Sequence, residues 1–253
     1  MPRMPQSRLT SATASLAGAL LCAASGALVR VARAQPTPPV AALRTYLAPG
    51  ALRAGIDSFA IVAGGAARGW QRIAVERDAA GWRLRDAVVL GAAVRQESRI
   101  RLASDLSEVE LRQEGQMGPT PMTIALDWAG NRVRGTAVTP SRGAAGPLAI
   151  DTVLAPGTVD DNAVLPLLSA VRWHGALDAA FPVLASGKGT VSTYRLRVLG
   201  ADTTSVPAGH FDTWRAELQG GGSTVVLHVT RAAPHRIVRA SPVGAPFEMQ
   251  RVR

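Results

Sequence analysis

The sequence predicts a mainly β protein whose antiparallel strands follow one another as a meander and curl into a sandwich or barrel. One observation is the alternation of apolar and polar residues with a period of two, typical of strands with one wet face. A second is the regular spacing of Gly-, Asp- and Asn-containing turn signals. A third is a single island with helical periodicity in mid-chain.

The clearest strand pattern lies in Val206–Arg239 and predicts three antiparallel strands joined by two turns. His210–Leu218 alternates, with Trp214 among the residues on its apolar face. Gly220–Ser223 supplies the backbone freedom that a hairpin turn requires. Ala232–Pro234 interrupts the ladder before a third strand.

Further strands are expected from residue 57 onward, and Asp86 shares the apolar face of one of them with Trp82, Leu84 and Val88. After residue 190 a strand places Tyr194 on the face opposite to its arginines. The expected turns are Asp78–Gly81, Ser104–Asp105, Gly115–Pro121, Ala129–Asn131, Ser141–Pro147 and Gly187–Thr190.

The helical island predicts a short helix over Asn162–Arg172 that covers an open end of the sheet. Asp160 and Asp161 are interpreted as capping residues of this helix. Pro166 is expected to kink the helix or to begin its second half. Asp178–Leu184 is interpreted as another helical turn, broken at Pro182.

The beginning of the chain predicts export. Residues 1–34 combine arginines at the start, an apolar run over Ala12–Val29 and an A-x-A cleavage site at Ala32–Ala34. A transmembrane anchor is the alternative, but the run is short and Pro residues follow it. Residues 35–56 are expected to be a Pro-rich spacer with a short helix over Ala41–Leu52, and residues 57–253 a single antiparallel β domain.

Charge and cysteine content narrow the possible chemistry. Cys22 is the only cysteine and would leave with the signal segment, so neither a disulfide nor thiol catalysis is expected. The chain carries a formal net charge of +10, almost entirely from arginine. A GC-rich genome explains this excess of arginine. Because the protein is expected to be exported, no nucleic-acid partner is expected.

Three parts of the sequence resemble the bacterial domain of unknown function 3108 (DUF3108) family. They are the helix with Leu165–Trp173, the V-P-A-G-x-F turn at Val206–Phe211, and the ending P-H-R-I-V-R before a last F-E-M strand. The resemblance is best over 151–252. It implies a curled antiparallel sheet, an incomplete β-barrel like the LolA/LolB-type lipoprotein carriers, with one or two short helices covering the concave side. It carries over no catalytic residue.

The histidines give no strong site. They lack the spacing of a zinc site, so no metal or cofactor is expected. His210 and Asp212 share a strand face and are the candidate base pair of a hydrolase, with His228 expected to face them across the Gly220–Ser223 turn. Locally satisfied sheet histidines are the simpler interpretation.

Arginine pairs spaced by two residues are the most unusual feature, because each pair projects from one strand face. They form either a solvated outer face or a basic wall toward anionic lipid head groups, partly neutralised by Glu108, Glu110 and Glu217. The candidate anion-facing residues are Arg83, Arg85, Arg99, Arg101, Arg132, Arg134, Arg195 and Arg197, and Arg251 and Arg253 form a further pair.

All five tryptophans, Trp70 included, are placed on the apolar side of their segments. Core packing is the default interpretation, and the lining of a ligand pocket in the concavity is the alternative. The candidate pocket or core residues are Trp82, Trp128, Trp173, Trp214, Tyr194 and Phe247.

Three function hypotheses follow. The first is a non-catalytic periplasmic protein of a Gram-negative bacterium that binds an apolar or amphipathic envelope ligand, such as a lipid or a lipoprotein acyl chain. The second is an interaction or structural module of the envelope that pairs a strand edge with a partner protein. The third is an envelope hydrolase using His210 and Asp212. After signal removal, no integral membrane protein is expected.

The export prediction is tested by intact-mass spectrometry of the protein from its own cells. We expect a mature chain that begins at Gln35, because signal peptidase cuts after small residues at positions −1 and −3. A mature protein that retains Met1 would contradict the assignment.

Overall fold

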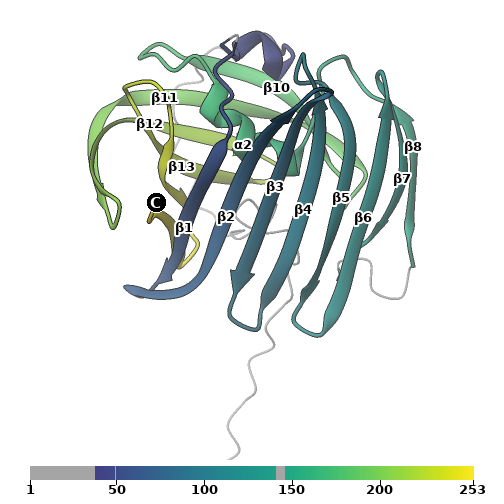
Figure 1. The fold of residues 1–253 in the computed structure, drawn as a ribbon, viewed down its shortest axis with the longest axis horizontal. Helices are drawn as coiled ribbons and strands as arrows, with labels where there is room; N and C mark the ends of the chain where they lie inside the picture. The colour runs from purple at the N-terminus through teal and green to yellow at the C-terminus, as the bar shows by residue number, and fades with distance from the viewer. Residues whose placement is uncertain (1–37, 49, 141–145) are drawn as a thin grey trace, which may run out of the picture.

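The computed structural model describes residues 38–48, 50–140 and 146–253, and these form one 15-stranded sheet in the order β8-β7-β6-β5-β4-β3-β2-β1-β15-β14-β13-β12-β11-β10-β9 (Figure 1). Neighbouring strands are antiparallel except β9 and β10, which are parallel. The strands are β1 (Gly55–Ala63), β2 (Ala66–Asp78), β3 (Gly81–Leu90), β4 (Val94–Ala103), β5 (Glu108–Met117), β6 (Thr120–Ala129), β7 (Arg132–Val138), β8 (Leu148–Val153), β9 (Val159–Asp160), β10 (Asp178–Ala185), β11 (Thr190–Val206), β12 (Gly209–Gly220), β13 (Ser223–Thr230), β14 (Ile237–Pro242) and β15 (Phe247–Arg251).

The sheet curls so that one face is concave and buried while the other is convex and wet. In β4, for example, Ile100 is buried and its neighbours Arg99 and Arg101 are exposed. The strands β10–β13 pass behind β1–β6, and β8 and β9 remain the two ends of the sheet (Figure 1). The prediction of a mainly β protein with a curled, incomplete barrel is confirmed.

The mid-chain helix lies between the two walls of the curled sheet (Figure 1). It comprises α2 (Asp161–Leu167) and the 3₁₀ turn η3 (Leu168–Ala170). Asp160 caps α2 by accepting a hydrogen bond from the backbone N–H of Asn162 at 2.9 Å. Pro166 removes one backbone donor, and the helix tightens to 3₁₀ geometry directly after it. A second short 3₁₀ helix, η1 (Leu43–Tyr46), lies within the predicted Ala41–Leu52 helix.

The predicted helical turn at Asp178–Leu184 is wrong, because this segment is strand β10. Its interior residues are buried on both faces, which removes the alternation that identifies a half-wet strand. The carbonyl of Ala180 points away from β11 and accepts from Ala41 N at 2.9 Å. Ala180 and Pro182 direct their backbone groups to the same side of β10, so the nitrogen of Pro182 also points away from β11. Among the described strands, only the two-residue β9 pairs with β10 on that side, and the missing N–H of Pro182 is tolerated there.

Two smaller expectations also need correction. The turn expected over Gly115–Pro121 is shorter, because β5 extends to Met117 and β6 begins at Thr120. Trp70 does not face the core: it is 47% exposed on the convex face, and the neighbouring Gln71 points inward instead. The three strands predicted in 206–239 are confirmed as β12, β13 and β14.

The proposed signal segment 1–34, Cys22 and most of the Ser141–Pro147 loop lie outside the described residues. Among residues 38–48, 50–140 and 146–253, no helix is long and apolar enough to cross a membrane.

Phe181→Ala tests the correction in β10. Phe181 is fully buried and lies beside Tyr194, with ring centroids 6.3 Å apart. Removing its ring from a packed core should lower the free energy of unfolding by about 3–5 kcal/mol, as measured by denaturant unfolding. Val191→Ala, on the exposed side of β11, is the control and should change it by less than about 0.5 kcal/mol. Equal effects of the two substitutions would contradict a buried β10.

Candidate ligand site at the mouth of the curled sheet

A pocket of about 60 Å³ opens at the end of the curled sheet where η1 meets the β4–β5 turn, the β6–β7 turn and the β8–β9 connection. We call it the mouth pocket. Leu167 of α2 forms part of its wall, so the helix limits its depth. About half of its lining is apolar side chains, and the polar members include the charged residues Arg44 and Glu108. The lining consists of Leu43, Arg44, Leu47, Leu106, Ser107, Glu108, Trp128, Gly130, Asn131, Leu154, Ala155, Gly157, Thr158, Val159 and Leu167.

Glu108 reaches this pocket because β5 contains a bulge. The pairing of β4 with β5 shifts between Arg101 and Leu102: Arg101 lies opposite Glu110, whereas Leu102 lies opposite Glu108. The extra residue, Val109, turns Glu108 onto the buried face. The expectation that Glu108 shares the outer face with the arginines is therefore wrong, since simple alternation cannot show a bulge.

Glu108 belongs to a buried polar cluster at the N-terminus of α2. Its Oε1 accepts a hydrogen bond from Asp160 N at 2.6 Å. Asn162 donates through Nδ2 to Asp160 and Asp161 at 2.8 and 3.1 Å, and its Oδ1 accepts from Ser98 at 3.1 Å. Ser186, which follows β10, donates to Asp161 at 3.2 Å. The cluster therefore connects β4, β5, the helix and β10.

Burial changes the protonation of these carboxyl groups. It raises the pKa of Glu108 to about 8, and the charge of Asp161 acts in the same direction, while the hydrogen bond from Asp160 N opposes the change. Burial also raises the pKa of Asp161. The pKa of Asp160 is raised well above its ordinary value by burial and by the neighbouring charges of Asp161 and Glu108. Because one oxygen of Glu108 already accepts a bond, the proton that it retains at neutral pH is carried by Oε2.

Two buried polar atoms from the residues lining the mouth pocket have no hydrogen-bond partner among the described residues, Glu108 Oε2 and Trp128 Nε1. With Glu108 protonated, both groups are donors. A buried donor without a hydrogen bond costs free energy, so a ligand that brings an acceptor oxygen into the pocket and accepts from these groups would be stabilised. The arrangement can hold an apolar group that carries an uncharged carbonyl oxygen.

A second, smaller pocket of about 40 Å³ lies on the other side of α2, where Leu165 and Pro166 form part of its wall. Asp57 lines it and pairs with Arg236 at 2.6 Å and with Arg251 at 2.7 Å. Arg251 is thus buried on the inner face of β15. The interpretation of Arg251 and Arg253 as one more outward-facing pair is wrong.

The aromatic candidates separate into three groups. Trp82, Trp173 and Tyr194 are buried in the core, and Trp173 donates through Nε1 to the Leu168 carbonyl at 2.8 Å. Trp214 and Phe247 are partly buried against that core, and Arg231 lies 4.9 Å from the Trp214 ring. Of the six, Trp128 is the one that lines the mouth pocket.

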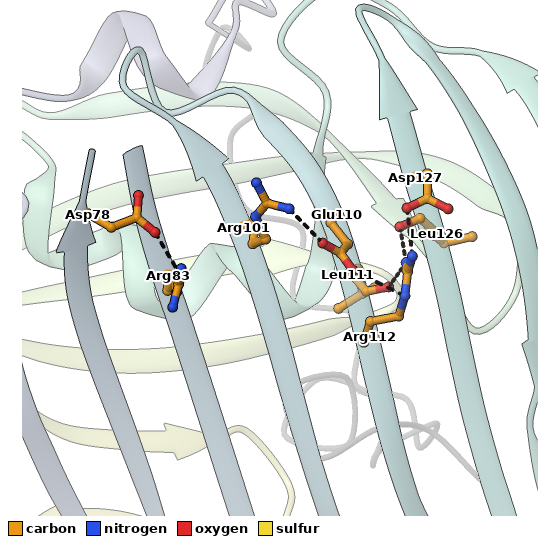
Figure 2. A network of polar contacts seen from close by, with 8 residues as sticks. All are labelled: Asp78, Arg83, Arg101, Glu110, Leu111, Arg112, Leu126 and Asp127. Carbon is orange, nitrogen blue, oxygen red and sulfur yellow. Dashed lines mark hydrogen bonds and ion pairs between the residues drawn. The ribbon is translucent and has the colours of Figure 1, made fainter. Parts of the chain in front are cut away.

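The candidate anion-facing arginines lie on the outer face in ion pairs rather than around the mouth. Figure 2 shows part of this network, in which Glu110 of β5 contacts Arg101 of β4 and Arg112 of its own strand. Arg197 contacts Glu217 at 3.4 Å, so Glu110 and Glu217 do neutralise neighbouring arginines as expected. The remaining pairs are Arg83 with Asp78, Arg85 and Arg99 with Glu97, Arg132 and Arg134 with Asp151, and Arg195 with Asp178.

The histidines are dispersed. His210 is exposed, and its Nδ1 lies 2.6 Å from Ser205 Oγ. His228 does not face His210, because it lies opposite Arg215 in the ladder and its Nδ1 is 2.6 Å from Thr204 Oγ1. Neither His210 nor Asp212 lines the mouth pocket. Within the described part of the chain, no group of three His, Cys, Asp or Glu residues is arranged to hold a metal ion.

Sequence reasoning missed the polar cluster. It assigned Asp160 and Asp161 to helix capping alone, and Glu108 to the outer face. The available signal was the pair of adjacent aspartates beside an otherwise apolar helix. A related signal was Asp86 on an apolar strand face: Asp86 is buried, accepts from Gln71 Nε2 at 2.8 Å, and burial raises its pKa to about 7.

A curled antiparallel sheet with a helix in its concavity defines the class, an open, barrel-like sheet protein. A family model described as "Protein of unknown function (DUF3108)" matches residues 82–250, and the chain belongs to this family. The match begins well before the 151–252 region in which the sequence motifs are most evident.

Comparison with solved structures supports the same fold. The chain is similar to a beta-barrel-like protein of domain of unknown function DUF1849 from Brucella abortus, with a TM-score of 0.50 and 8% identity over 79% of this chain and 95% of that one. At this identity the likeness concerns the fold alone. A search of curated proteins gives no match.

Glu108→Gln tests the protonation of the cluster. In the unfolded chain the carboxyl releases its proton above its ordinary pKa of 4.5, whereas in the folded protein it retains the proton up to about 8. The contribution of Glu108 to the free energy of unfolding is therefore fully present below pH 4.5. It is lost as the pH rises to 8, and the free energy of unfolding falls by up to about 1.4 kcal/mol per pH unit. Glutamine imitates the protonated carboxyl, so the free energy of unfolding of the variant should fall less steeply over this range.

Asp151→Asn serves as the control, measured by denaturant unfolding at several pH values. Asp151 lies on the convex face, where the hydrogen bond from Arg132 lowers its pKa, so this substitution should leave the slope between pH 5 and 8 unchanged. A Glu108→Gln slope equal to that of the wild type would show that Glu108 is already ionised in the folded protein.

Proposed function

We propose that the protein is an exported, non-catalytic binding protein of the Gram-negative periplasm that takes one end of an amphipathic envelope ligand into the mouth pocket. The observation that carries the proposal is the combination, in one pocket, of apolar walls and two unpaired buried polar groups, Glu108 Oε2 and Trp128 Nε1. Binding sites commonly combine an apolar lining with a few convergent polar groups.

The size of the pocket favours partial entry of the ligand. A volume of about 60 Å³ is far below that of a site for a drug-sized molecule, and the centre of the curled sheet is filled by α2 and the core. One end of an acyl chain fits this space, and the remainder would stay outside at the mouth.

The buried acids favour an uncharged acyl ester or amide over a free fatty acid in the inner part of the pocket, whereas the cation of the lining, Arg44, is exposed. Glu108 is accompanied by Asp160 and Asp161, and a carboxylate brought to the same place would be repelled by any of these groups that is ionised. A neutral carbonyl oxygen accepts from Trp128 and from protonated Glu108 without this penalty.

An interaction module is the second candidate, and strand β8 favours it. Among the described strands, β8 ends the sheet order and pairs only with β7, which leaves its other edge without a strand partner there, and such an edge can accept a strand of a partner protein. Native mass spectrometry of the protein taken from its own envelope distinguishes the two candidates: a co-purified lipid supports the carrier and a co-purified protein supports the module.

Trp128→Phe tests the mouth pocket directly. Titration calorimetry with monooctanoylglycerol, an uncharged acyl ester, should show binding to the wild type and binding about three- to tenfold weaker to the variant, because one neutral hydrogen bond is lost while the aromatic shape is kept. Trp70→Phe removes the same group from the convex face and should bind as the wild type does. Equal affinities of all three proteins would contradict the site.

His210→Ala addresses the hydrolase hypothesis in the same assay. We expect the variant to bind monooctanoylglycerol like the wild type, since His210 lies outside the pocket. Release of octanoate by the wild type and its loss in His210→Ala would instead support an enzyme.

A further inference from the structure

The convex face carries an arginine arrangement that the mouth pocket does not explain. Arg85, Arg99 and Arg112 lie directly opposite one another on β3, β4 and β5. We call these three residues the arginine row. Ala74 on β2 and Ala125 on β6 occupy its two ends, so the row itself contains no acidic residue. The carboxylate of Glu97, two positions before Arg99 on β4, bridges Arg85 and Arg99.

A second row beside it repeats the juxtaposition. Arg83 and Arg101 face each other across β3 and β4, with Glu76 and Glu110 at the two ends. Figure 2 shows Arg83 in contact with Asp78, and Arg101 on the neighbouring strand in contact with Glu110. Like charges directly opposite in a sheet are unfavourable, so the contacts between these arginines do not themselves stabilise the sheet.

These arginines surround a groove of about 410 Å³ on the convex face. Its lining includes the five arginines of the two rows and two glutamates, Glu76 and Glu110. With Asp78, Glu97 and Asp127, which contact these arginines, five acids face five arginines, so the site offers guanidinium donors rather than a net positive charge. The short side chain of Ala74 is part of the lining and leaves space beside Arg85.

Carboxylates around the groove hold the guanidinium groups in place. Glu97 contacts Arg85 and Arg99, each at 2.6 Å, and Asp78 contacts Arg83 at 2.8 Å. At the other rim Arg112 contacts Asp127 at 2.7 Å. These acids reduce the net charge of the face, but they also fix side chains that would otherwise lose entropy when an anion binds.

The arginines keep donors for a ligand. Arg83, Arg85, Arg99 and Arg101 each contact a carboxylate through one nitrogen, whereas a guanidinium carries five N–H donors. The side chains of Arg83, Arg85 and Arg99 are each 62% exposed. Guanidinium groups bind phosphate in a bidentate manner, and neighbouring rows on a strand lie about 7 Å apart.

From this geometry we propose that the convex groove binds a ligand that presents two or more phosphate groups, with one phosphate held by Arg85 and Arg99 and another by Arg83 and Arg101. The ligand is a soluble polyphosphate-type anion or a phosphate-bearing lipid head group, since both present the same chemistry. The site is separate from the mouth pocket and does not depend on the function proposed for it.

The test compares two double variants that remove the same charge. Arg85→Gln with Arg99→Gln removes the core of the arginine row. Arg132→Gln with Arg134→Gln removes a pair from β7 on the same convex face, outside the groove, where both arginines contact Asp151. Each protein is titrated with inorganic tripolyphosphate at low salt, and its co-sedimentation with phosphatidylglycerol and phosphatidylcholine vesicles is measured.

We expect the wild type and the β7 variant to bind tripolyphosphate, and the groove variant to bind at least tenfold more weakly. Binding to phosphatidylglycerol vesicles alone, with the same dependence on the groove, supports the site and assigns the phosphate to a membrane. Absence of binding to either probe, or equal losses in both variants, would overturn the proposal. The thermal midpoint of the groove variant should not fall, because relief of like-charge pairs offsets the lost ion pairs, and this separates loss of binding from loss of folding.

Discussion

The structure depends on the buried polar cluster at the N-terminus of α2. Asn162 joins Ser98 on β4 to the carboxyl groups of Asp160 and Asp161, Glu108 on β5 accepts from Asp160 N, and Ser186 completes the connection to β10. A curled sheet of this length has no strand pairing between its two ends, so the helix and these contacts join the opposite walls. Inside a low-dielectric core such contacts are strong when satisfied and costly when broken.

The same burial arranges the charges of the whole molecule. Burial raises the pKa of Glu108 and of Asp86 on the concave side, because ionising a carboxyl group there is unfavourable. The arginines are mostly on the convex side, where water and surface carboxylates compensate them. The mouth at the end of the sheet and the outer face therefore differ in chemistry: buried carboxyl groups with raised pKa values lie at the mouth, and arginines in ion pairs lie on the outer face.

Packing also decides how large an internal site this fold can offer. The helix, Phe181 and Trp173 belong to the packed core, and the two inner pockets formed by the described residues lie at the mouth and beside α2. The similarity in fold to the DUF1849 protein at 8% identity indicates that chains with few identical residues can form related β-sheet folds.

The sequence by itself determined the mainly β class, most strand positions, the hairpin over Gly220–Ser223 and the mid-chain helix, because period-two and period-3.6 patterns are local consequences of burying one face. It also placed the paired arginines on one strand face. Only the tertiary structure decided that Glu108 turns inward, that Asp178–Ala185 is a strand and that Arg251 is buried. These three features are a bulge, burial on both faces of a strand and an ion-pair partner on another strand. Each depends on contacts between segments far apart in the chain, and such contacts leave no periodic signal in either segment alone.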